Sequence, residues 1–276
     1  MKKKIKLPIL IVLLAIGGLA VSFFIREKEQ SNKKIKVSGN IETTDIRLSF
    51  RVSGKIKELL TDEGRPVNAG DILARLDTDE LMKIKSEAEA SSKATQYSYE
   101  RARDDYSRAE NLFQAGSISA QKRDAAKTAS DAAAANVEAL SASLELATTR
   151  LGFAELASPI DGFVLVKSAE EGEVVQAGAT VFTVANLRDI WLTAYINETD
   201  LGKVKLNQEA EVRTDTFLNK TYKGRVSFIA QEAEFTPKQI QTMEERVKLV
   251  YRIKIKVDNA NLELKPGMPA DGIILE

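Results

Sequence analysis

Apolar residues recur along this chain with several different spacings, and each spacing predicts a different kind of element. An uninterrupted run of 19 uncharged residues occupies positions 7–25. Between residues 35 and 77, Val, Ile and Leu alternate with polar residues in short runs separated by glycines, which is typical of half-buried strands. Residues 79–154 contain no proline and are rich in Ala, Glu, Lys, Gln and Arg, which predicts a helical segment.

Within the helical segment, apolar or small residues return every seven positions on both sides of a break at AGSIS, residues 115–119. One series before the break is Leu81, Ala88, Thr95, Ala102 and Ala109, and one after it is Ala126, Ala133, Leu140, Ala147 and Ala154. Two heptad runs joined by a short break predict an antiparallel coiled-coil hairpin over residues 78–154. Gly116 suits the left-handed residue that ends the first helix, and Ser119 can cap the second. Each arm is then ~50 Å long.

A sequence repeat with an offset of 108 residues flanks the predicted hairpin. Its first copy, residues 54–76, reads GKIKELLTDEGRPVNAGDILARL, and its second, residues 162–184, reads GFVLVKSAEEGEVVQAGATVFTV. Glycine readily adopts positive φ, so matched glycines predict matched turns. These turn glycines are Gly54, Gly64 and Gly70 in the first copy and Gly162, Gly172 and Gly178 in the second. Neither half is long enough for a stable domain, so residues 35–77 and 155–187 should together form one small β-sandwich.

Alternating strands return in the last part of the chain, residues 188–276. About six short runs surround the lone Trp191, which suggests a small β-barrel, and NETDLGKV predicts one helical turn. For the N-terminal strand of the first sandwich half, the alternative placement is in this barrel. The expected fold class is therefore mixed α and β, elongated and multi-domain.

The apolar run from Leu7 to Ile25 predicts a transmembrane helix, since 19 residues cover ~28 Å. Lysines crowd residues 1–6, so this end is expected in the cytoplasm, with residues 26–34 as a linker to an exported, periplasmic body. The expected location is the inner membrane, with a single pass. The alternative is a cleaved signal peptide, for which GLA at 18–20 is a poor cleavage site.

Composition excludes several classes of function. The chain has no cysteine and no histidine, so Cys nucleophiles, Ser-His-Asp triads and His- or Cys-ligated metals are absent. Residues 1–34 hold eight basic and two acidic side chains, which leaves 32 basic and 38 acidic residues in the body. A mildly acidic body argues against nucleic-acid binding. We expect no catalytic residues, no metal and no cofactor, hence no enzyme.

Three segments carry a resemblance to a known family: FRVSGKIKELLTDEGRPVNAGDILARLD, LASPIDGFVLVKSAEEGEVVQAG and LELKPGMPADGIIL. Together with the hairpin between the half-repeats, they resemble the HlyD-like periplasmic adaptors, or membrane fusion proteins, whose sandwich is lipoyl-like. Adaptors of this family that dock on TolC-type channels carry Arg, then Leu four later and Ser seven after that at the hairpin tip. Here those positions are Arg108, Leu112 and Ser119. Their ordinary alternatives are an ion pair of Arg108 with Asp104, packing at the turn, and a helix cap.

The resemblance implies partners and a role. It implies a subunit of a tripartite exporter that bridges an inner-membrane transporter to a TolC-like outer-membrane channel and assembles with itself, as a hexamer. An ABC permease is the favoured transporter, because adaptors of resistance-nodulation-division pumps usually add a domain after the barrel and this chain stops at Glu276. The alternatives are an adaptor of a major-facilitator pump and a periplasmic scaffold. A lipoyl carrier role is rejected, since Lys83 and Lys85 fall within the predicted helix.

Overall fold

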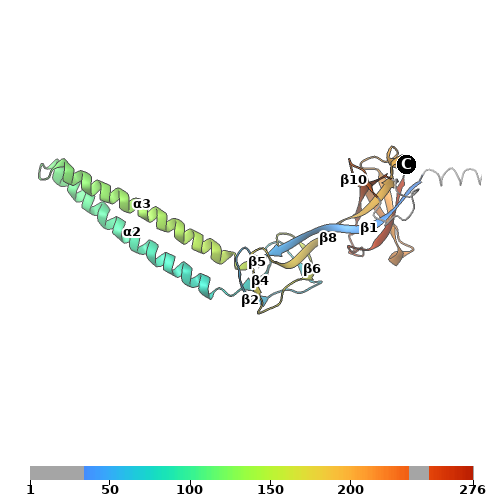
Figure 1. Cartoon of the computed structure of the whole chain (residues 1–276), viewed down its shortest axis with the longest axis horizontal. Helices are drawn as coiled ribbons and strands as arrows, with labels where there is room; N and C mark the ends of the chain where they lie inside the picture. The colour runs from blue at the N-terminus through green and yellow to red at the C-terminus, as the bar shows by residue number, and fades with distance from the viewer. Residues whose placement is uncertain (1–33, 236–248, 276) are drawn as a thin grey trace, which may run out of the picture. The chain divides into compact units, whose positions relative to one another are not determined.

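The computed structural model describes residues 34–235 and 249–275, and these form two compact units (Figure 1). One unit combines the N-terminal strand up to Thr44 with residues from Asn186 onward, and the other covers residues 45–185. No helix within the described ranges is both long and apolar enough to cross a bilayer. The predicted anchor, residues 7–25, lies outside the described residues.

The second unit contains a β-sandwich built from both half-repeats, as the repeat predicts. One buried cluster joins side chains of the first half, such as Phe50 and Leu73, to side chains of the second, such as Val164 and Phe182. Its strands are β2 (Gly54–Leu59), β3 (Pro66–Val67), β4 (Ile72–Leu76), β5 (Glu155–Ala157), β6 (Gly162–Lys167), β7 (Val174–Val175) and the first part of β8 (Thr180–Asn197).

The two halves exchange equivalent hydrogen bonds at the 108-residue offset. The amide of Gly64 donates to the carbonyl of Val164 at 2.8 Å, and the amide of Gly172 donates to the carbonyl of Ile56 at 2.9 Å. Each donor and each acceptor has its counterpart 108 residues away. The sandwich is therefore a pseudo-symmetric pair in which each half completes the turn of the other.

Five of the predicted turn glycines have positive φ, from 73° to 92°: Gly64, Gly70, Gly116, Gly172 and Gly178. The prediction was wrong for the remaining two. Gly54 and Gly162 are the first residues of β2 and β6, not turn residues. A Cβ on Gly54 would stand 3.1 Å from Cδ1 of Leu76, so close packing against β4 explains its lack of a side chain.

Between the halves, α2 (Asp79–Gln114) and α3 (Ala120–Gly152) form the predicted antiparallel hairpin (Figure 1). The residues at the heptad positions are buried or half-buried, while most others are exposed. Thr95, Ser130 and Ala147 are the buried ones within the two helices. Small side chains at these positions let the helices approach closely. Where α3 ends, the guanidinium of Arg51 lies 4.0 Å from the ring centre of Phe153 and ties the hairpin to the sandwich.

The first unit is a closed β-barrel in which six strands follow one another round the ring as β1, β13, β9, β10, β12 and β8. β1 pairs with β13 over Lys34–Asn40, so this part of the N-terminal strand belongs to the barrel. The strands are β1 (Lys34–Ser49), the second part of β8, β9 (Glu209–Thr214), β10 (Tyr222–Ile229), β12 (Leu249–Asp258) and β13 (Pro269–Leu275). Short elements complete it: α4 (Glu198–Leu201), the 3-10 turn Asp215–Phe217 and β11 (Glu234–Phe235).

Trp191 does not fill the barrel, contrary to the expectation that the strands surround it. Its neighbours Ile190 and Leu192 are fully buried, and alternation along β8 turns the indole to the outer face. There its Nε1 donates to the hydroxyl of Thr193 at 3.0 Å, and the ammonium of Lys254 lies 4.2 Å from the ring centre. Branched aliphatic side chains fill the interior instead.

Candidate functional site: the hairpin tip

The turn between α2 and α3 is fixed by its own backbone. The amide of Gly116 donates to the carbonyl of Phe113 at 2.9 Å, and the amide of Ser117 donates to the carbonyl of Leu112 at 2.8 Å. With Gly116 at φ 73°, these two bonds form a Schellman motif, which satisfies carbonyls that a helix end leaves unpaired. The turn therefore has a defined backbone conformation, which fixes the Cα positions of the residues beside it.

The three residues proposed from the sequence lie together at this end of the hairpin, and all three are exposed. Leu112 keeps 48% of its surface open to solvent although it is apolar. Arg108 pairs with Asp105, three residues earlier, and not with Asp104, which pairs with Arg103. At i,i+3 and i,i+4 a helix offers both acids, so sequence spacing alone could not choose between them.

Ser119 holds the N-cap position of α3 with extended backbone, yet its side chain makes no capping bond. Its carbonyl accepts the amides of Lys122 at 3.1 Å and Arg123 at 3.3 Å. Ser119 is thus a cap by position, and among the described residues its hydroxyl has no hydrogen-bond partner.

A brace that the sequence analysis missed links the two helices just behind the turn. The guanidinium of Arg123 on α3 lies 4.5 Å from the ring centre of Phe113 on α2, and its Nη1 is 3.9 Å from the carboxylate of Glu110. The Arg123 side chain is only 28% exposed. The sequence contained a signal for this contact, since Arg123 lies seven residues before the buried Ser130 and therefore at the same heptad position.

The tip presents three different chemical groups to solvent. An exposed leucine offers apolar area, Arg108 offers a charged donor held by a neighbour in sequence, and Ser119 offers a hydroxyl. Exposed apolar side chains on a rigid element are typical of binding sites. Among the described residues, no group of three or more His, Cys, Asp or Glu side chains could hold a metal ion.

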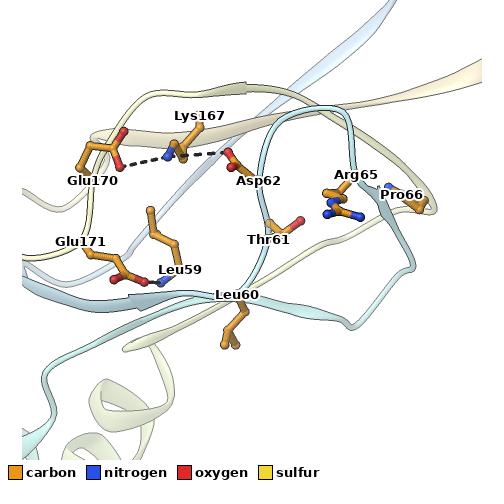
Figure 2. A pocket seen from close by; sticks show the side chains of 9 residues that line it. All are labelled: Leu59, Leu60, Thr61, Asp62, Arg65, Pro66, Lys167, Glu170 and Glu171. Atoms are coloured by element: carbon orange, nitrogen blue, oxygen red, sulfur yellow. Dashed lines mark hydrogen bonds and ion pairs between the residues drawn. The ribbon is translucent and has the colours of Figure 1, made fainter.

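A second candidate is an open hollow of about 800 Å³ between the equivalent loops of the two sandwich halves, residues 59–66 and 167–174 (Figure 2). Its polar groups mostly bind each other across the halves. Glu171 accepts the amide of Leu59 at 2.8 Å, and Glu63 accepts the amide of Lys167 at 2.9 Å, which are again counterparts at the 108-residue offset.

The one lysine of this hollow is already occupied. The ammonium of Lys167 lies 3.0 Å from Glu170 and 3.7 Å from Asp62 (Figure 2). Its hydrogen bond to Glu170 raises the pKa of Lys167 above the ordinary value. A lysine held in its charged form by two carboxylates is not a nucleophile. The hollow is best explained as the joint between the two halves.

Comparison with known families agrees with this architecture. The family model described as the barrel-sandwich hybrid domain of RND membrane fusion proteins matches residues 37–187, and the model of the YknX-like β-barrel domain matches residues 190–271. The first covers more than half of the chain. The chain therefore belongs to the membrane fusion proteins, the periplasmic adaptors of efflux systems, and the resemblance read from the sequence is confirmed.

Among curated proteins, it is similar to a UPF0194 membrane protein of Yersinia enterocolitica, with 30% identity over 97% of both chains. Among solved structures, a MacA–MexA chimera that contains the Pseudomonas aeruginosa MexA α-hairpin domain has a TM-score of 0.67 and 25% identity, over 88% of this chain and 82% of the chimera. MacA of Actinobacillus actinomycetemcomitans has a TM-score of 0.72 and 24% identity, over 88% and 79% of the chains, and this similarity concerns the fold alone.

Proposed function

We propose that this adaptor links an inner-membrane transporter to a TolC-like outer-membrane channel and that the hairpin tip is its contact with the channel. The observation that carries the proposal is the exposed Leu112 beside Arg108 on a turn that the Schellman motif and the Arg123 brace hold in place. A preorganised surface loses less entropy on binding than a flexible one. The unbonded hydroxyl of Ser119 adds a hydrogen-bonding group on the same turn.

The proposal extends to the rest of the assembly. The apolar run 7–25 anchors the chain in the inner membrane with its N-terminus in the cytoplasm, and several copies, six by family resemblance, surround the export path. An ABC permease supplies the energy. The resemblance of the sequence AEFTPKQIQTMEERVKLVYRIKIKV, residues 233–257, to adaptors of ABC exporters supports that class of transporter. A major-facilitator permease is the alternative.

The decisive experiment uses the absence of native cysteine. A Ser117→Cys variant is cross-linked in whole cells, purified from the membrane in mild detergent and analysed for attached and co-purifying proteins. A channel attached at the tip and an ABC permease retained with the complex would support the proposal. Recovery of a major-facilitator permease would instead assign the transporter to that class and contradict the ABC permease. Self-adducts alone would favour a scaffold and contradict channel docking.

Mutation of the tip gives an independent test. Leu112→Asp removes the apolar contact and adds a charge, so we expect export to fall at least tenfold. The free energy of unfolding should change by less than about 0.5 kcal/mol, because the side chain is exposed. Leu146→Asp is the matched control, since Leu146 is 52% exposed on the same hairpin but away from the turn. Equal export by the two variants would contradict docking through Leu112.

A further inference from the structure

A rigid loop, residues 202–208, lies at the barrel end where β1 begins. The amide of Lys205 donates to Oε1 of Gln208 at 2.7 Å, and the amide of Asn207 donates to the carbonyl of Val226 at 2.8 Å. Nε2 of Gln208 donates to the carbonyl of Leu275, 2.9 Å away, and Leu275 pairs with Lys34, the first residue of β1. The loop is therefore hydrogen-bonded to β10 and β13, the two strands on either side of β9.

This fixed loop exposes an apolar side chain. Leu206 keeps 59% of its surface open to solvent, whereas Val204 in the same loop is 6% exposed and belongs to the barrel core. The following residue, Asn207, has φ 65°, a left-handed conformation that asparagine tolerates better than most residues. Local backbone strain of this kind persists where the surroundings hold it, and it is common at binding sites.

Exposed lysines occur in this loop and on the adjoining start of β1. Lys34, Lys36 and Lys205 are exposed, and none of them has a carboxylate partner among residues 34–235 and 249–275. Lys203 pairs with Asp200 at 2.7 Å and adds no net charge. One apolar side chain among lysines does not resemble the centre of a protein interface, which is enriched in aromatic residues and depleted of lysine. Lysines around an apolar side chain are typical of surfaces that bind anionic lipid.

Chain length keeps this barrel end near the membrane. The predicted anchor ends at Ile25, and only eight residues separate it from Lys34. Fully extended, those residues span at most ~30 Å. A tethered surface binds weakly interacting partners at high effective concentration, so one leucine and three lysines can suffice where a free protein would not bind.

We propose that the loop 202–208, together with Lys34 and Lys36, contacts the headgroups of anionic phospholipids and that Leu206 inserts into the membrane interface. This rests on the membrane anchoring in the proposed function. The contact would fix the orientation of the barrel relative to the bilayer.

The test uses the full-length protein in nanodiscs that contain phosphatidylglycerol and spin-labelled phosphatidylcholine. Leu206→Cys is labelled with an environment-sensitive fluorophore, and Leu218→Cys is the matched control, because Leu218 is 80% exposed beyond the opposite end of β9. We expect lipid quenching at position 206 to exceed that at 218 at least twofold. Replacing phosphatidylglycerol by phosphatidylcholine, or adding Lys205→Glu, should remove most of the difference.

Equal quenching at both positions in nanodisc-bound protein would overturn the lipid contact and leave the proposed adaptor function standing. Shielding of the label at 206 only after the transporter is added would also overturn it and assign the loop to a protein partner. Failure of the protein to co-elute with nanodiscs would overturn both the loop contact and the membrane anchoring.

Discussion

The brace behind the hairpin tip gives the sharpest quantitative prediction. Arg123→Gln removes the guanidinium from the ring of Phe113, 4.5 Å away, and from Glu110, 3.9 Å away. The ion pair of Arg123 with Asp124 lies within α3 and does not link the helices. A partly exposed cation–π contact contributes about 1 kcal/mol. The long, partly exposed pair with Glu110 contributes about 0.3 kcal/mol. We therefore expect Arg123→Gln to lower the free energy of unfolding by about 1 kcal/mol, since neither contact is fully buried.

A double-mutant cycle isolates the stacking. Urea unfolding, followed by far-UV circular dichroism, is measured for Arg123→Gln, Phe113→Leu and the double variant. The expected coupling is about 1 kcal/mol, and hydrogen exchange at the amide of Ser117 should accelerate in each variant. Arg123→Lys keeps the charge and should recover part of the loss. A coupling below about 0.3 kcal/mol would show that the two side chains contribute independently and that the brace does not hold the tip.

Three further predictions concern the scaffold. Gly39→Ala should destabilise the barrel by about 3 kcal/mol or more in thermal unfolding, because its Cβ would lie 1.8 Å from the carbonyl oxygen of Thr193; a loss below about 1 kcal/mol would contradict this. Gly116→Ala should lower the free energy of unfolding, measured by urea denaturation, by about 1 kcal/mol. The cause is the positive φ alone, since nothing lies within 4 Å of the added Cβ. The hydrogen bond from Lys220 lowers the pKa of Glu263, so the stability it adds is present above the carboxyl's unfolded pKa and is lost as pH falls through the folded pKa; Glu263→Gln should flatten the acid side of the stability profile, and an unchanged profile would exclude this carboxyl as a cause.

Much of the fold follows from the sequence, because it depends on local and periodic signals. The heptads place the hairpin seam, and the 108-residue repeat predicts one sandwich from two distant segments, since each half alone is too short to bury a core. Matched glycines predict most turns. Gly54 and Gly162 were misassigned because a glycine required for close packing and one required for positive φ look identical in a sequence.

Side-chain conformations and the distances between elements are the part that the sequence could not supply. The choice of Asp105 over Asp104 by Arg108 depends on side-chain conformation, and the position of Trp191 depends on which face of β8 meets the barrel core. The Arg123 brace joins residues from different helices, and its distances require the turn geometry. The docking role of Leu112 stays a prediction, since exposure alone does not identify a partner.

The pairing of β4 with β5 has a consequence for the reach of the molecule. Arg75 lies opposite Glu155, and the two side chains join at 2.9 Å. The chain therefore leaves and re-enters the sandwich at adjacent strands, so the whole helical hairpin is topologically the loop of a β-hairpin. Such a loop can grow or shrink without altering the strands that carry it. One heptad added to each arm would lengthen the hairpin by about 10 Å, so the length of the hairpin can change independently of the fold of the sandwich that carries it.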